Sequence, residues 1–236
     1  MAAEQEPHLT PQLQEHYEKE AEILMLLVDL EQRYQEFYKL YQCEVEGQKI
    51  IIERLWKLTQ RYLILISCVP GCRYPEVYTL SAEEAIINEY EEKLETIRHS
   101  NNEMKNALME LNNHCKHFYN VYGELNKSLE TPFIMGDKHH RSIRYHKIMT
   151  VDIFNYLYAA VLKMKCYMHQ LDPINLDSVE DYRELLNKDS EREEFKEYLE
   201  NNYIFCKCLK PAPTCPIEKL KCLHQNIQSL RYVSRV

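Results

Sequence analysis

The strongest constraint on the fold of this chain is a long series of mostly apolar residues spaced alternately by four and three positions. The series begins at residue 24 and ends at residue 66, and no proline interrupts it. Residues with this spacing share one face of an α-helix, and a long series of them is typical of a coiled-coil seam. Its thirteen positions are Leu24, Leu27, Glu31, Tyr34, Tyr38, Tyr41, Val45, Gln48, Ile52, Leu55, Thr59, Tyr62 and Ile66.

Thr10-Pro11 is a suitable start for this helix. A threonine hydroxyl caps the first amides, and proline lacks an N–H that would otherwise remain unpaired there. We therefore predict a helix over about residues 11–67, roughly 85 Å long at 1.5 Å per residue. Gly47 is its weak point, because glycine costs about 1 kcal/mol relative to alanine in a helix. The alternative is a break at Gly47 that folds the helix back on itself.

A second helix is predicted after the turn signals Pro70-Gly71 and Pro75. Ser81 followed by Glu84 forms a capping-box pattern, which predicts a helix over about residues 82–130 that ends before Thr131-Pro132. Only one position of its seam is polar. The seam consists of Ile87, Tyr90, Leu94, Ile97, Asn101, Met104, Leu108, Leu111, Cys115, Phe118, Tyr122, Leu125 and Leu129.

The short connection between the two long helices predicts an antiparallel hairpin. If the connection is symmetric, residues that face each other have numbers that sum to about 149. Gln48 then lies opposite Asn101, and a buried amide pair of this kind fixes the register of a helix pair at some cost in stability. The alternative is that both amides face water.

The rest of the chain predicts three shorter helices, over about residues 142–171, 179–206 and 216–232. The expected fold is therefore all-α, with a long antiparallel coiled-coil hairpin followed by a small C-terminal group of shorter helices. In this interpretation the hairpin covers residues 11–130 and the C-terminal group covers residues 138–232. No stretch is apolar and long enough to predict a transmembrane segment.

Two parts of the first helix are apolar beyond a single face, so each needs more than one neighbour to cover it. We predict that one is covered within the chain and that the other binds a partner. The candidate partner-binding residues are Ile23, Leu26 and Leu27 in the first part and Ile51, Leu58 and Leu65 in the second.

Basic residues at three-residue spacing form a ridge at the start of the third helix. They follow Lys138 and comprise Arg141, Arg144 and Lys147. A second basic block covers residues 207–236. Because the net charge is −8, we favour contact with the acidic helices of the same chain or with a protein partner over contact with nucleic acid.

The sequence contains no arrangement that predicts catalysis or a cofactor. Four glycines form no phosphate-binding loop, and nine cysteines without an export signal indicate reduced thiols in the cytosol or nucleus. The densest cysteine cluster lies near the C-terminus. We interpret it as packed thiols at a helix joint, with a structural zinc held by Cys206, Cys215 and Cys222 as the alternative.

These patterns predict a non-catalytic coiled-coil subunit or scaffold of a larger protein assembly. We expect helical protein partners, in a hetero-oligomer or a homodimer. The expected location is the cytoplasm, and spindle, kinetochore, centrosome and axoneme complexes are assemblies of this type. The alternative is an adaptor that binds nucleic acid or an anionic membrane surface through the basic segments 138–147 and 207–236.

Overall fold

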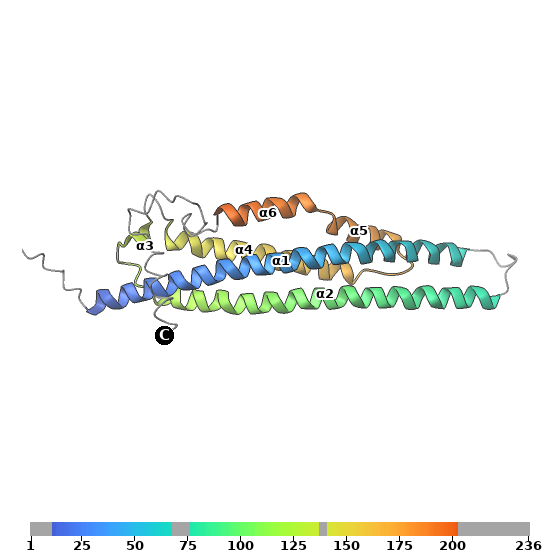
Figure 1. The fold of residues 1–236 in the computed structure, drawn as a ribbon, viewed down its shortest axis with the longest axis horizontal. Helices are drawn as coiled ribbons and strands as arrows, with labels where there is room; N and C mark the ends of the chain where they lie inside the picture. Colours follow the sequence, from blue (N-terminus) through green and yellow to red (C-terminus); the bar gives the residue numbers. More distant parts are fainter. Residues whose placement is uncertain (1–10, 68–75, 137–140, 203–236) are drawn as a thin grey trace, which may run out of the picture. The chain divides into compact units, whose positions relative to one another are not determined.

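The computed structural model of the chain describes residues 11–67, 76–136 and 141–202. These residues form helices and no β-strand, which confirms the all-α prediction (Figure 1). An isolated bridge between Asp172 and Asn175 closes the turn before the fifth helix. The helices are α1 (Pro11–Ser67), α2 (Glu76–Glu124), α3 (Pro132–Met135), α4 (Ile143–Met168), α5 (Leu176–Leu186) and α6 (Asp189–Asn202).

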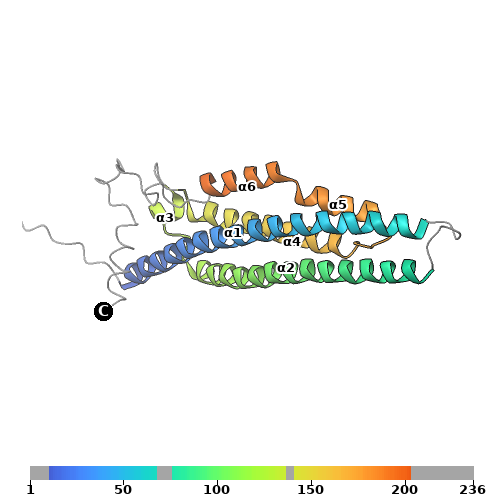
Figure 2. The ribbon, with the colours of Figure 1, turned by 45° about the vertical axis from the view of Figure 1, so that its right-hand side comes forward.

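The two long helices pack against each other as an antiparallel hairpin, as predicted, and lie side by side in both views (Figures 1 and 2). α1 is one helix of 57 residues that continues through Gly47, so the alternative of a break at this glycine is wrong. The predicted seams face the interior. Every seam position is buried except Glu31, Tyr62 and Ile66 in α1, Ile87 in α2, and Leu129, which follows the end of α2.

The chain divides into two compact units. Unit 1 comprises Met1–Tyr34, Leu111–Ile153 and Tyr198–Val236, and unit 2 comprises Gln35–Glu110 and Phe154–Glu197. Each unit thus takes part of α1, part of α2 and part of α4. The predicted division into a hairpin at 11–130 and a C-terminal group at 138–232 separates continuous segments of the sequence. The two compact units, by contrast, each combine segments that are distant in sequence.

The ends of α2 differ from the prediction. The helix begins at Glu76 rather than at residue 82, so the Ser81 capping pattern lies inside it. It ends at Glu124 rather than at residue 130. The amide oxygen of Asn126 accepts a hydrogen bond from the backbone N–H of Ser128 at 3.1 Å. Such a side-chain bond to the local backbone replaces the helical hydrogen bond and favours a turn.

The predicted helix over 179–206 consists of two helices. α5 begins three residues early because Asn175, rather than Ser178, is its N-cap: its side-chain oxygen accepts from the Ser178 N–H at 3.2 Å. α5 ends at Leu186, with Asn187 as its C-cap, and α6 begins at Asp189. α4 agrees closely with the predicted 142–171. The predicted helix over 216–232 lies outside the described residues.

Unit 1 is organised around Tyr34, a fully buried seam residue of α1. Its hydroxyl donates a hydrogen bond to the backbone oxygen of Thr150 in α4 at 2.9 Å. The same hydroxyl lies 3.1 Å from the sulfur of Cys115 in α2. One side chain therefore joins α1, α2 and α4 within this unit.

Unit 2 is held together by contacts of α5 and α6 with α1 and α4. The Tyr38 hydroxyl of α1 donates to the backbone oxygen of Arg192 in α6 at 2.6 Å. The ring of Phe195 in α6 stacks on Tyr156 of α4, with the centroids 3.7 Å apart. α5 lies beside α1 (Figure 2). The guanidinium of Arg183 in α5 donates a hydrogen bond to the carboxylate of Glu53 in α1 at 2.5 Å.

Candidate interaction surfaces

The most polar part of the interior of unit 2 surrounds Gln48, which is 1 % exposed. Its amide nitrogen donates to the Ser100 hydroxyl at 2.6 Å and to the Asn101 side-chain oxygen at 3.0 Å. Its amide oxygen accepts from the Tyr182 hydroxyl of α5. The pair that the register count places together is therefore formed, and the side-chain amide of Gln48 has a partner at both its donor and its acceptor.

The neighbours of this amide are themselves paired. The Ser100 hydroxyl donates a hydrogen bond to a carboxylate oxygen of Glu44 at 2.5 Å. The amide nitrogen of Asn101 donates to the sulfur of Met168 in α4 at 3.4 Å. Burial raises the pKa of the Tyr182 hydroxyl, so it stays a donor at neutral pH. Because its members satisfy one another, this network fits a structural role in setting the register.

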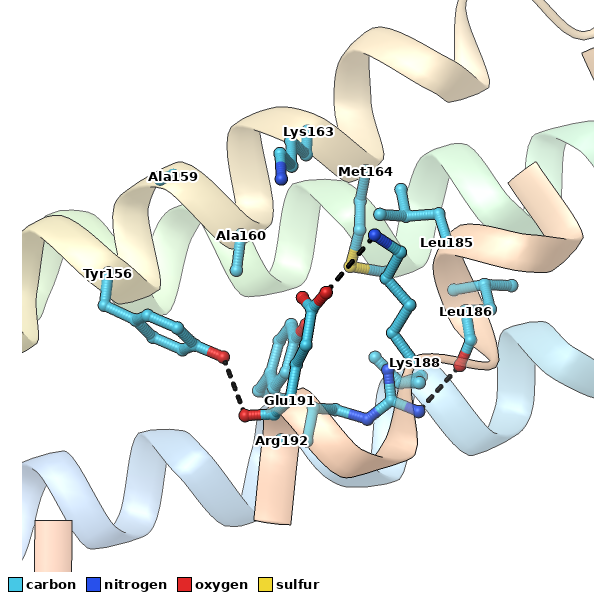
Figure 3. Close-up of a pocket in the computed structure, with 12 residues that line it drawn as sticks. Tyr156, Ala159, Ala160, Lys163, Met164, Leu185, Leu186, Lys188, Glu191 and Arg192 are labelled. Atoms are coloured by element: carbon cyan, nitrogen blue, oxygen red, sulfur yellow. Dashed lines mark hydrogen bonds and ion pairs between the residues drawn. The ribbon is translucent and has the colours of Figure 1, made fainter. Parts of the chain in front are cut away.

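A small pocket of about 160 Å³ lies between α1, α4, α5 and α6 within unit 2 (Figure 3). Arg192, a buried charged residue, forms part of its wall and donates to the backbone oxygen of Leu186 at 2.7 Å and to Asp189. Lys188 pairs with Glu191 at 3.3 Å. Figure 3 shows the contacts of Arg192 with Leu186 and of Lys188 with Glu191 as dashed lines.

The polar groups of this pocket are poorly suited to acid–base chemistry. Burial raises the pKa of the Tyr156 hydroxyl to about 12, and the neighbouring Tyr41 and Tyr38 add to this shift. Burial also raises the pKa of Tyr41, against the opposing charge of Arg192. Both tyrosines are therefore protonated at neutral pH, and the guanidinium already has a carboxylate partner. The pocket resembles a packing junction more than a reaction site.

Unit 1 contains a buried cluster that the sequence analysis missed. The His16 ring nitrogen lies 3.0 Å from a carboxylate oxygen of Glu20, one helical turn away. The Thr131 hydroxyl donates to the same oxygen at 2.5 Å and also accepts from the N–H of Ile134, which caps α3. The signal was the i, i+4 spacing of His16 and Glu20, but such pairs are common on exposed helix faces.

The first set of predicted partner-binding residues lies mainly in the interior. Ile23 and Leu27 are buried within unit 1, and Leu26 is half-buried. In the second set, Leu58 is buried, whereas Ile51 and Leu65 are half-buried. The second apolar part of α1 nevertheless remains partly uncovered, because Ile50 is 76 % and Ile64 is 66 % exposed. The sequence signal for these two residues is their spacing of fourteen residues, or two heptads, outside the main seam.

The basic ridge contacts aromatic rings rather than carboxylates. The Arg141 guanidinium lies 4.2 Å from the centre of the Tyr145 ring, and the Lys147 ammonium lies 5.1 Å from that of Tyr122. These are cation–π distances. Arg144 is exposed, and Lys138 lies outside the described residues. Two of the three described cations are therefore already engaged within unit 1.

Metal and membrane sites receive no support from the described part of the chain. No group of three or more metal-binding side chains occurs in it. None of its helices has an apolar stretch that would let it traverse a bilayer. The zinc alternative involves Cys206, Cys215 and Cys222, which lie beyond the last described residue.

Comparisons with protein-family models, with curated proteins and with solved structures found no match to this chain.

Proposed function

We propose that this chain is a non-catalytic helical subunit of a larger protein assembly, in which helices of other proteins cover apolar residues near the α1–α2 connection. The observation that supports this role lies in unit 2, where α1 ends and α2 begins. Ile64 and Ile66 in the last turn of α1, and Leu80 in the first turns of α2, are about half exposed or more. Single exposed apolar residues are normal, but several of them near one end of a hairpin favour an interaction site.

The interior of the hairpin supports the same role. Around Gln48 its buried polar residues bond to one another and hold α1, α2 and α5 together. A chain of this kind uses its length and its surfaces rather than a reactive centre. Within this class we propose cytoskeletal assemblies of the spindle, kinetochore, centrosome or axoneme type, on the basis of architecture alone.

Co-purification from native cells under mild conditions tests this proposal. We expect a stoichiometric set of helical proteins to accompany the chain. The triple variant Ile64→Ser, Ile66→Ser, Leu80→Ser should lose at least one of these proteins while its circular dichroism spectrum remains helical. Ile148→Ser is the matched control, because Ile148 is an exposed isoleucine of unit 1.

Two results would contradict the proposal. The first is a partner-free monomer at cellular concentration. The second is an identical set of co-purifying proteins for the wild type and the triple variant. Immunofluorescence together with a spindle or centrosome marker tests the narrower cytoskeletal proposal, and a diffuse signal throughout the cell cycle would contradict it.

A further inference from the structure

A second series with four- and three-residue spacing runs along α1 within unit 2, and we call it the outer seam. It is offset by two residues from the buried seam, which corresponds to about 200° around the helix axis. All its members are exposed except Arg54, which is half-buried. It contains the two most exposed large apolar side chains of the described residues, Ile50 and Ile64. Its positions are Cys43, Gly47, Ile50, Arg54, Lys57, Arg61 and Ile64.

A hollow of about 600 Å³ lies on the outer seam beside Gly47. Cys43 and Ile50 of the outer seam line it, and Asn187 closes one side. A methyl group on the Cα atom of Gly47 would meet no other atom within 4 Å. The packing of the chain therefore does not require glycine here, although glycine weakens a helix. The absence of a side chain instead leaves room for another molecule to approach the backbone closely.

The charges of the outer seam indicate which charges a molecule bound there must carry. Glu46 and Glu53, which line the hollow, are each paired with a basic residue of unit 2, at 2.7 and 2.5 Å. Lys57 and Arg61 form no ion pair within 4 Å among the described residues, and Arg61 acts on Glu89 only from a greater distance, where Arg54 already pairs with that carboxylate. The unpaired charge along the outer seam is therefore positive, in a chain whose net charge is −8.

We propose that the outer seam binds one amphipathic helix of a different protein, which carries acidic residues opposite Lys57 and Arg61. An apolar side chain of this helix enters the hollow at Gly47 and contacts Ile50. This inference rests on the proposed function, because it identifies the surface and the kind of partner of the proposed subunit. Apolar residues at the same four- and three-residue spacing give the partner helix a matching face.

A second copy of this chain fits the outer seam less well. In an antiparallel pair of outer seams centred on Arg54, whose charge Glu89 already balances, Lys57 and Arg61 face Ile50 and Gly47 of the other copy and gain no acidic partner. In a parallel pair, Lys57 and Arg61 each lie beside their own counterparts. Like charges that face each other across a helix interface oppose association and select another partner. An acidic helix removes this repulsion and adds ion pairs at its edge.

Photo-crosslinking in native cells tests the inference, with p-benzoylphenylalanine at position 50 and, as a control, at position 148 on the exposed side of α4. We expect position 50 to crosslink to a peptide of another protein that has heptad spacing and acidic residues. Gly47→Leu should fill the hollow and lower the crosslink yield at least tenfold. Lys57→Glu should lower it about as much.

The isolated Gly47→Leu variant should unfold at the same temperature as the wild type or higher, because no atom of the chain surrounds the new Cβ. Loss of the crosslink with retained stability then reports on binding rather than on folding. Crosslinks to another copy of this chain, an equal yield with Gly47→Leu, or no product at position 50 would each overturn the inference. If partners still co-purify in those cases, the proposed function stands. If no partner is found at all, both fail.

Discussion

One pair of side chains in each compact unit meets across the hairpin. The two pairs have the same register but differ in polarity. In unit 1, Tyr34 meets Cys115, and in unit 2, Gln48 meets Asn101. The residue numbers sum to about 149 in both, as the hairpin geometry predicts. The first pair combines residues that also suit an apolar seam. The second buries two amides, which tolerate few other partners, so the stronger register constraint lies in unit 2.

The largest effect is expected for Gln48→Leu, which leaves Asn101, Ser100 and Tyr182 without their amide partner. Unfolding in urea should show a loss of about 3 kcal/mol, since unpaired buried polar groups carry their full desolvation cost. The double variant Gln48→Leu, Asn101→Leu should recover part of this loss. Gln60→Leu on the half-buried side of α1 is the control. A loss below about 1 kcal/mol would show that the amide network is not a strong register constraint.

A smaller effect is expected for Tyr34→Phe in unit 1. This change removes the hydrogen bond to the Thr150 backbone oxygen and the contact with the weakly polar Cys115 sulfur, but keeps the ring. We expect a loss of about 1 kcal/mol in the same urea measurement. Tyr17→Phe serves as control because Tyr17 is exposed. A loss as large as that of Gln48→Leu would show that the two pairs constrain the register equally strongly.

Thr59 and Tyr90 form a third pair at the same register, in unit 2. Neither buried hydroxyl has a hydrogen bond of good geometry among the described residues, although the Thr59 hydroxyl is near enough to oppose the rise that burial causes in the pKa of Tyr90. Thr59→Val keeps the shape and removes one unpaired hydroxyl. We expect a gain of about 1 kcal/mol in the free energy of unfolding. Thr96→Val, whose exposed hydroxyl donates to Glu92, should give no gain. A loss with Thr59→Val would indicate a hydrogen bond to a buried water.

The smallest effect concerns a pair outside the seam, Arg54 with Glu89, which is joined by hydrogen bonds of 2.5 and 2.8 Å. The hydrogen bonds from Arg54 hold the pKa of Glu89 below its usual range. Glu89 therefore contributes stability above its unfolded pKa, and this contribution is lost as the pH falls through its folded pKa. Between about pH 5 and pH 3, the urea midpoint of Glu89→Gln should fall less than that of the wild type. Glu110→Gln, an exposed carboxylate of the same helix, should follow the wild type.

The seam positions could be predicted from the sequence because a heptad pattern reports directly on which side of a helix is buried. The amide pair could be predicted as well, since Gln48 and Asn101 are polar interruptions of apolar series. Tyr34 with Cys115 could not, because both residues look apolar in such a pattern. In α4, Phe154 shares the spacing of the buried Leu157 and Val161 but is half-buried, and its neighbour Ile153 is buried instead.

Helix ends were predicted less well, because several residues compete to cap or to end a helix. Asn175 outcompetes Ser178 as the cap of α5, and Asn126 ends α2 before the proline that appeared to end it.

The outer seam was not predicted, for another reason. One glycine and three cations separate its apolar members, so it does not resemble a core-forming face in the sequence. The exposure of Ile50 and Ile64 in the structure identifies it as a surface feature.

The interleaving of the two compact units along the chain has a consequence for biosynthesis. Unit 2 is complete in sequence at Glu197, whereas unit 1 combines the part of α1 that precedes residue 35 with segments synthesised much later. The first turns of α1 can be buried only after Leu111–Ile153 has been synthesised. Neither unit can be excised as one continuous fragment, because a cut anywhere between residues 35 and 197 separates parts of the same unit.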